Sequence, residues 1–270
     1  MIDVDVLGIG VWSEAFSNWD EFRSALDGDI RESSAKLAPQ VIPAKERRRA
    51  PMSVKMAVEV MHQACQMADQ DPAEIATVFA SAIGDMQITD YMCRTLADAP
   101  RTISPTKFHN SVHNAAVGYW SIATESHQPA NAVSGFTDSV SIAILEGAIQ
   151  TAEEQLPVLV AAQEITAPPP LGSIYATGHP FAMAILLAPT GTHPSPMTSM
   201  QLGFESEAIK PPHLPDIPGI DLSGNYAARS LPLLEAISKR QDAEVKLPLS
   251  SRMALVASIA AGSPATQAEN

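Results

Sequence analysis

Two hydrophobic patterns alternate along the first 190 residues. Continuous apolar runs are typical of buried strands, and they predict strands over 4–11, 76–83, 156–162 and 181–188, with a shorter strand at 130–134. Apolar residues spaced three and four apart form one buried helical stripe, and they predict helices over 19–26, 52–68, 88–97, 104–124 and 138–152. Strands that alternate with helices favour an α/β fold.

The expected architecture is a mixed, mainly parallel sheet with helices on its faces. Gly8 and Gly10 allow close backbone approach at the turn expected after the first strand. Asp71, followed by Pro72 and by Glu74, predicts a short helix, because an aspartate cap and a first-turn proline favour helix starts.

The pattern changes beyond Pro189, where prolines cluster at 194, 196, 211, 212, 215 and 218. We therefore divide the chain into a domain at 1–190 and a remainder at 191–270. The remainder is expected to contain an irregular arm, which covers 190–225, and then C-terminal helices. Further elements are expected at 226–240 and 251–261, and the last eight residues are expected to fray.

Charge and composition narrow the possible partners. An apolar content of 46% suffices for a core. The chain has 17 Lys and Arg against 30 Asp and Glu, and the net charge of −13 opposes binding to nucleic acids and anionic lipids. The basic run at 45–49 is expected to form a solvated helix face or an intersubunit salt bridge. No signal peptide and no membrane span are expected, which favours the cytoplasm.

The cysteines and two of the histidines lie in helical patterns. Cys65 and Cys93 lack a Cys-x-x-Cys partner, so both thiols are expected to pack in the core without a disulfide. His109 and His113 are four residues apart, and on one helix they would share a face. No third ligand lies nearby, so we expect hydrogen-bonded helix residues near a subunit contact and no metal. No cofactor is expected.

The stretch from Asn131 to Ser139 joins a short strand directly to an apolar helix. Small residues, Gly135 and Ser139, stand two positions before and after Thr137. A sharp strand-to-helix turn needs such small neighbours when its central residue is strained and points into a pocket. An ordinary tight turn before a core helix explains the same pattern.

The order of several motifs resembles the N-terminal half of β-ketoacyl synthases. The motifs are Ile9-Gly10-Val11, Ser104-Pro105 through Ala123, the turn around Thr137, Val158 to Gln163, and Gly178 through Leu187. They cover residues 1 to about 190. The chain is most similar to the short chain length factors of aryl polyene and xanthomonadin-type pathways, so the resemblance implies a thiolase-like fold.

The resemblance also implies that this chain lacks the catalytic machinery. The residue that matches Thr137 in an active synthase is a cysteine, whose thiolate is favoured by a helix N-terminus. This degenerate position, Thr137, is flanked by Ser134, Gly135, Phe136, Asp138 and Ser139. The negative charge of Asp138 would disfavour a second anion, such as a threonine alkoxide, at position 137.

Synthases of this family also use two histidines from a C-terminal half, and residues 188–270 are too few for such a half. His193 lies in a Gly-Thr segment that resembles a histidine loop of the family, but the order of residues differs. We expect no catalytic role for it.

The expected function is therefore a non-catalytic chain-length-factor-like subunit in polyene or fatty-acid-type biosynthesis. It would pair with a catalytic β-ketoacyl synthase, shape its acyl pocket and possess no enzymatic activity alone. An acyl carrier protein is a further expected partner. By resemblance, the strand Asn131, Ala132 and Val133 would form the cross-subunit contact.

Two alternatives remain open. One is an acyltransferase or hydrolase that uses Ser134, Thr137 or Ser139 as nucleophile with His109 or His113 as base. The other is a homodimeric scaffold that binds acyl chains.

Overall fold

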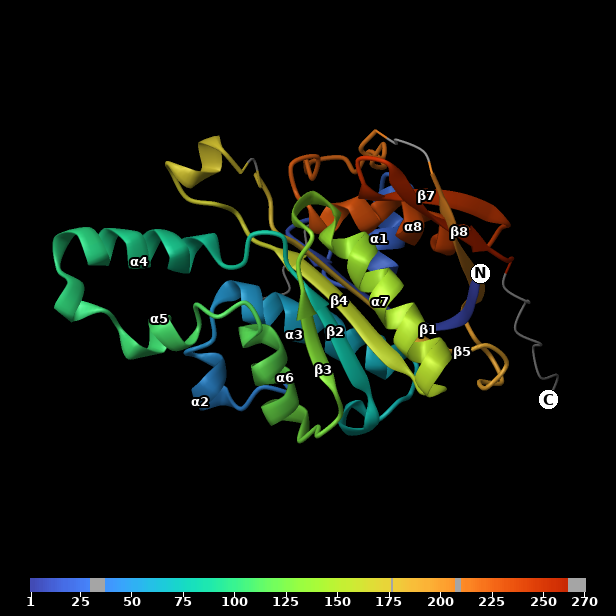
Figure 1. Ribbon diagram of the computed structural model, residues 1–270, viewed down its shortest axis with the longest axis horizontal. Helices are drawn as coiled ribbons and strands as arrows, with labels where there is room; N and C mark the ends of the chain where they lie inside the picture. Colours follow the sequence, from blue (N-terminus) through green and yellow to red (C-terminus); the bar gives the residue numbers. More distant parts are fainter. Residues whose placement is uncertain (30–36, 176, 207–209, 262–270) are drawn as a thin grey trace.

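The computed structural model describes residues 1–29, 37–175, 177–206 and 210–261, and one eight-stranded sheet runs through them. The strands are β1 (Ile2–Ser13), β2 (Ala76–Ala80), β3 (Ala130–Val133), β4 (Val158–Glu164), β5 (Phe181–Pro189), β6 (Thr198–Glu205), β7 (Ala243–Ser250) and β8 (Met253–Ile259). Their order across the sheet is β3-β2-β4-β5-β1-β6-β8-β7 (Figure 1). β3 and β7 are therefore its two edges.

Eight α-helices are described. They are α1 (Trp19–Leu26), α2 (Ala44–Arg47), α3 (Met52–Met67), α4 (Met86–Asp98), α5 (Pro105–His109), α6 (Ala115–Thr124), α7 (Ser139–Glu154) and α8 (Leu231–Ser238). Short 3₁₀ turns lie at Pro72–Glu74, Pro100–Thr102, Phe136–Asp138, Leu171–Ser173 and Ala227–Ser230. α4 and α5 form an arm that projects from the body of the molecule on the side of β3 (Figure 1).

The sheet is mixed, as predicted, but the expectation of mainly parallel pairs is wrong. Only β2 with β3 and β2 with β4 pair in parallel, whereas the other five pairs are antiparallel. The central strands β4, β5 and β1 are buried along nearly their whole length. A strand buried on both faces reads as a continuous apolar run, and that run carries no information on direction.

Each face of the sheet is covered by its own helices. α7, α1 and α8 share one buried cluster with one face, and α3 and α6 share a second cluster with the other face. On the α3 side, an added Cβ at Gly8 would lie 2.1 Å from the Ala64 carbonyl oxygen, and one at Gly10 would lie 1.9 Å from that of Val60. The glycines thus let α3 approach the middle of β1, not a turn after it.

The structure confirms most predicted elements before residue 190. α1 has the predicted limits, because Asn18 accepts a hydrogen bond from Glu21 N and the apolar side of the helix is buried. The predicted stripe of α3 is buried, with Ala68 at the C-cap of the helix; its residues are Val54, Ala57, Val58, Met61, Ala64, Cys65 and Ala68. Asp71 accepts from Ala73 N and starts the predicted short helix, which is a 3₁₀ turn. Cys65 is buried, as predicted.

The predicted helix at 104–124 is wrong, because residues 110–114 form turns between α5 and α6. Asn110 donates from its side chain to Arg49 O, and Ser111 donates from its hydroxyl to Phe108 O. Such short polar side chains compete with the helical backbone bonds. The separation places His109 at the end of α5 and His113 in the turn.

The expectation of an irregular arm followed by C-terminal helices is also wrong in part. β6 lies inside the 190–225 segment and pairs with β1 and β8. β7 and β8 follow α8 and continue the same sheet across the division expected at residue 190. The expected fraying of the last eight residues lies outside the described residues. No helix within the described ranges has the length and apolar character needed to cross a membrane.

Candidate functional site

The turn between β3 and α7 is sharp, but its strained residue is Phe136. Phe136 has a φ of 52°, in the left-handed region that a bulky residue rarely adopts. Thr137 and Asp138 follow in a short 3₁₀ turn that leads into α7. The expectation that Thr137 itself is the strained residue is therefore wrong, since a sequence does not reveal which residue of a turn has positive φ. That Thr137 matches the catalytic cysteine stays a prediction.

The hydroxyl groups of the turn are engaged in local hydrogen bonds. Ser139 Oγ accepts from Gly135 N at 2.9 Å and donates to Phe136 O at 2.7 Å, which closes the turn. Thr137 Oγ1 donates to Asp138 Oδ1 at 3.2 Å. Ser134 Oγ donates to Ala82 O at 3.3 Å. Within the described ranges no histidine forms a hydrogen bond with these three hydroxyls.

An ion pair occupies the N-terminus of α7. Arg229 Nη1 lies 3.0 Å from Asp138 Oδ1, and each side chain is only 17% exposed. The carboxylate stands where the helix dipole favours an anion. The N-terminus of α7 therefore carries an anion from the chain itself, and the guanidinium of Arg229 compensates its charge.

Aromatic rings cover the same turn. The Phe136 ring lies 5.3 Å from that of Tyr226 and 6.4 Å from that of Tyr175, measured between ring centroids. The Arg229 guanidinium lies 5.9 Å from the centre of the Tyr226 ring. These contacts join the turn to the loop after β4 and to the segment before α8. Phe136 nevertheless keeps half of its surface exposed.

The two histidines expected on one helix face do not share a helix. His113 Nε2 lies 2.8 Å from the carbonyl oxygen of Ser81, at the end of β2, and His109 is exposed. The separation removes the geometric basis for a shared ligand pair. No cluster of three possible metal-ligating side chains occurs among the residues that the structure describes. His193 lies between β5 and β6, where it accepts from Ser195 N at 3.3 Å.

A buried carboxyl group lies at the end of β4, and the sequence patterns did not predict it. Glu164 Oε1 accepts from Ser81 Oγ at 3.1 Å and from Ala82 N, while Oε2 has no hydrogen-bond partner among the described residues. Burial raises the pKa of Glu164 to about 8, against the lowering effect of these hydrogen bonds. The sequence does contain one pattern that could have identified this residue, because Glu164 is an acidic residue shortly after a predicted apolar strand.

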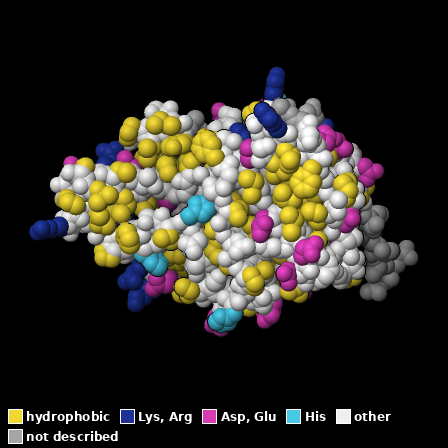
Figure 2. Space-filling view, in the orientation of Figure 1, with side chains coloured by type: hydrophobic (Ala, Val, Ile, Leu, Met, Phe, Trp, Pro, Cys, Tyr) yellow, Lys and Arg dark blue, Asp and Glu magenta, His cyan; other side chains and the backbone are white. Residues whose placement is uncertain are grey.

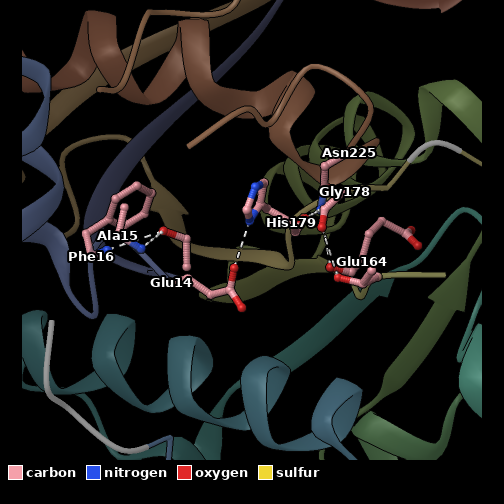
Figure 3. Close-up of polar contacts among 9 residues, drawn as sticks. Glu14, Ala15, Phe16, Glu164, Gly178, His179 and Asn225 are labelled. Atoms are coloured by element: carbon pink, nitrogen blue, oxygen red, sulfur yellow. Dashed lines mark hydrogen bonds and ion pairs between the residues drawn. The ribbon is translucent and has the colours of Figure 1, made fainter. Parts of the chain in front are cut away.

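Asn225 fixes the surroundings of this carboxyl group. Its side-chain nitrogen donates to the backbone oxygens of Glu164, at 3.2 Å, and His179, at 2.9 Å (Figure 3). Its side-chain oxygen accepts from the backbone nitrogens of Ala227 and Ala228. The His179 ring in turn contacts Glu14 at 2.8 Å. Asn225 therefore joins the segment before α8 to the ends of β4 and β5.

The predicted interface strand β3 lies at the edge of the sheet and is exposed. β3 pairs with β2 alone in the described part of the chain, and Thr77 N donates to Pro129 O. Successive residues of a strand direct their backbone groups to opposite edges. Residues 129, 131 and 133 therefore face β2, and the N–H and C=O groups of Ala130 and Ala132 face outward.

Exposed apolar side chains occur on the elements that lie on the same side of the molecule as this edge. Large hydrophobic residues are exposed on the arm, on the turn after it, on α6, at Phe136 and on the loop after β4; they are Leu96, Phe108, Val112, Ile122, Phe136 and Ile174. Figure 2 shows hydrophobic side chains over the arm of α4 and α5 and over the loop after β4. Exposed apolar side chains in this number on one side of a molecule are typical of a binding surface.

The two cysteines lie outside the turn. Burial, with a smaller effect of Asp71, raises the pKa of the Cys65 thiol to about 12. Cys93 is exposed on α4, so the expectation that it packs in the core is wrong. Of α4, only Met86 and Ile88 are buried, because the arm projects from the body and its apolar side has no cover from within the described chain.

Comparison with known proteins gives one family match. Residues 18–215 match the family model of the β-ketoacyl synthase N-terminal domain. No curated protein sequence matches the chain significantly.

Solved structures share the fold at low sequence identity. A ketosynthase in complex with its chain length factor, from Xenorhabdus doucetiae, matches with a TM-score of 0.73 and 20% identity over 96% of this chain and 100% of that chain. The ishigamide ketosynthase/chain length factor matches with a TM-score of 0.73 and 12% identity over 97% and 100% of the two chains. A type II polyketide ketosynthase in complex with its acyl carrier protein matches with a TM-score of 0.77 and 11% identity over 96% and 99%. These likenesses confirm the predicted thiolase-like α/β fold.

Proposed function

Because the chain belongs to the β-ketoacyl synthase family through its N-terminal domain, we propose that it is a chain length factor. In this role it pairs with a catalytic ketosynthase and shapes the pocket into which the growing acyl chain extends. The proposal is supported by the shared fold with structures that are described as ketosynthase and chain length factor complexes.

The chemistry of the turn supports a subunit without its own condensing activity. Neither Phe136 nor Thr137 carries a thiol, and the carboxylate of Asp138 occupies the helix N-terminus. The buried Cys65 has a raised pKa, which disfavours its thiolate. Cys93 lies on the projecting arm. Carbon–carbon bond formation is therefore assigned to the partner.

The open edge of β3 is the observation that carries the proposal. β3 has the sequence Ala-Asn-Ala-Val, with neither a charged residue nor a proline to block pairing. At the opposite edge, β7 contains Glu244, Lys246 and Pro248. Charged residues and proline are the features by which sheet edges resist further strands. The sheet therefore presents one receptive edge, flanked by exposed apolar side chains.

Co-expression with a candidate ketosynthase tests the proposal. We expect a 1:1 complex on size-exclusion chromatography, and we expect condensation of acyl and malonyl thioesters by the complex but not by this chain alone. Turnover by the isolated chain would exclude a non-catalytic role. A stable homodimer that does not bind the ketosynthase would favour the acyl-binding scaffold instead.

Thr137→Val tests the alternative of a hydroxyl nucleophile. The substitution removes one hydrogen bond to Asp138, so assembly and the partner's condensation rate are expected to stay nearly unchanged. An acyltransferase or hydrolase that depends on this hydroxyl would instead lose activity within an intact complex. Intact mass after incubation with an activated acyl thioester reports whether any hydroxyl becomes acylated.

The substrate class and the second partner follow from the same proposal. Resemblance to chain length factors of aryl polyene pathways suggests a polyene acyl chain. An acyl carrier protein would deliver it as a thioester, and one structure that shares the fold is a ketosynthase bound to its acyl carrier protein. Reconstitution of the pathway with and without this chain, followed by analysis of product length, tests both points.

A further inference from the structure

Helix α6 is apolar on nearly all sides, but it is buried on only one. Its sequence from Ala115 to Thr124 contains no charged residue. Ala116, Val117 and Trp120 pack toward the core, whereas Ile122 on the opposite side is 80% exposed. A helix that is hydrophobic all round is normally buried all round. The outer side of α6 therefore lacks a cover within the described chain.

Gly118 stands in the middle of this outer side, and the fold does not require a glycine there. A Cβ at Gly118 would meet no atom within 4 Å, whereas one at Gly8 or Gly10 would collide with the α3 backbone. Gly118 also lies in a regular helix, where glycine is less stable than alanine. Because no described residue approaches this position, its lack of a side chain favours close approach by an outside element.

A groove runs along the same side of α6. Its volume is about 620 Å³, and its lining beyond α6 includes Glu46 of α2, Pro105 of α5, and Ile42 and Arg49, which lie before and after α2. The groove is open and mostly apolar, and it has a charged pair on its rim, since Arg49 Nη1 lies 4.0 Å from Glu46 Oε1. An acyl chain in an open groove would keep one side in water. A helix would cover the groove and leave the rim charges hydrated.

The groove is continuous with the open sheet edge. α6 packs against β3, the next element along the chain. The turn before α6 carries the exposed Val112, and α5 carries the exposed Phe108. A partner that paired with β3 would therefore extend over α6 and the groove.

From these observations we infer that α6 is a helix-docking surface, on which a helix of the catalytic ketosynthase crosses close to Gly118 and closes the groove. Small residues at a crossing point allow two helix backbones to approach closely, so Ala115 and Gly118 provide the crossing and Ile122 provides an apolar anchor. The inference rests on the proposed pairing with a ketosynthase, and it adds a second contact to the strand edge.

Substitution at Gly118 tests the inference, with binding to the purified ketosynthase as the readout. Gly118→Leu fills the groove from its floor and should weaken association at least 30-fold. Gly118→Ala should weaken it less and keep a melting temperature equal to or above that of the wild type, because the Cβ has free space. Ile122→Ser removes the anchor without touching the core and should weaken association about 10-fold.

Gln66→Leu is the matched control, because Gln66 is an exposed neutral residue on α3, and its binding should equal that of the wild type. Wild-type binding in all three α6 variants would overturn the inference and leave the proposed function intact. If the wild-type chain fails to bind any ketosynthase, the proposed function and the inference both fall. If the chain forms a homodimer that Gly118→Leu disrupts, the groove is occupied by a second copy of the chain.

If an α6 variant keeps the complex intact but changes the length of the product, the groove is occupied by the acyl chain. Either result overturns the inference.

Discussion

Arg229 lies 91 residues from Asp138 in the sequence, and its Nη1 is 3.0 Å from the Asp138 carboxylate, directly before the first residue of α7. The pair joins the segment before α8 to the turn that follows β3. Because both side chains are largely buried, each charge depends on the other for compensation. The turn is therefore held in place by the C-terminal part of the chain.

Arg229→Met should lower the free energy of unfolding by about 1–3 kcal/mol, since it leaves the Asp138 carboxylate without its partner. Lys239→Met is the control, because the ion pair of Lys239 with Glu235 lies on the surface and should contribute less than about 0.5 kcal/mol. Urea unfolding of both variants measures the difference. An equal loss of unfolding free energy in both variants would show that the pair of Arg229 and Asp138 contributes no more than a surface ion pair.

Gly10→Ala should destabilise the fold by about 3 kcal/mol or more, because the new methyl group would lie 1.9 Å from the backbone oxygen of Val60. The backbone cannot rotate away as a flexible side chain can. Gly118→Ala, where the space is free, should instead stabilise the fold by up to about 1 kcal/mol. Thermal unfolding of the two variants gives the sign of each effect. A neutral Gly10→Ala would contradict the close approach of α3 to β1.

Ala132→Pro should weaken the complex with the ketosynthase about 100-fold and leave the isolated chain's melting temperature nearly unchanged. The Ala132 N–H faces outward, and loss of buried hydrogen bonds at an interface costs about 1–3 kcal/mol for each unsatisfied group. Asn131→Pro is the matched neighbour. Its N–H faces β2, so this variant should lower the melting temperature itself. The same loss of stability in both variants would show that the outward assignment of Ala132 is wrong.

Stability should fall as pH rises from about 4.5 to about 8, through the titration of Glu164. Its pKa is raised to about 8 in the folded chain, so the folded state retains a proton that the unfolded state has lost. The contribution is fully present below the unfolded pKa and is lost as pH rises through the folded value. Glu164→Gln keeps the group neutral and should remove this slope. Unfolding at pH 5, 7 and 9 measures it, and equal slopes in both proteins would contradict the prediction.

The sequence could predict helices that carry a capping side chain or a periodic apolar pattern. α1 and α3 are examples, because Asn18 caps the first and a regular stripe is buried by the second. β6 was missed although Met200, Leu202 and Phe204 alternate with other residues. Prolines on both sides of that segment favoured irregular structure over this short alternation. In β7, Pro248 obscured a similar alternation, and an edge strand can accommodate it.

The candidate site could be predicted only as far as its position along the chain. The strand-to-helix turn lies where its small residues indicated, and β3 is exposed at the sheet edge. The positive φ of Phe136 and the pairing of Asp138 with Arg229 depend on contacts between distant segments. The exposure of Cys93 depends on the projection of α4, which amphipathic spacing alone does not reveal.

The difference between the two sheet edges limits the size of the assembly. Growth of a fibre needs two complementary ends on every copy, so that each newly added chain offers a site for the next. Here β7 ends in charge and proline while β3 stays open. Once β3 is covered, this chain offers no second open edge in the described sheet. Strand addition should therefore stop at two chains, and the protein should resist edge-to-edge aggregation as long as its partner is present.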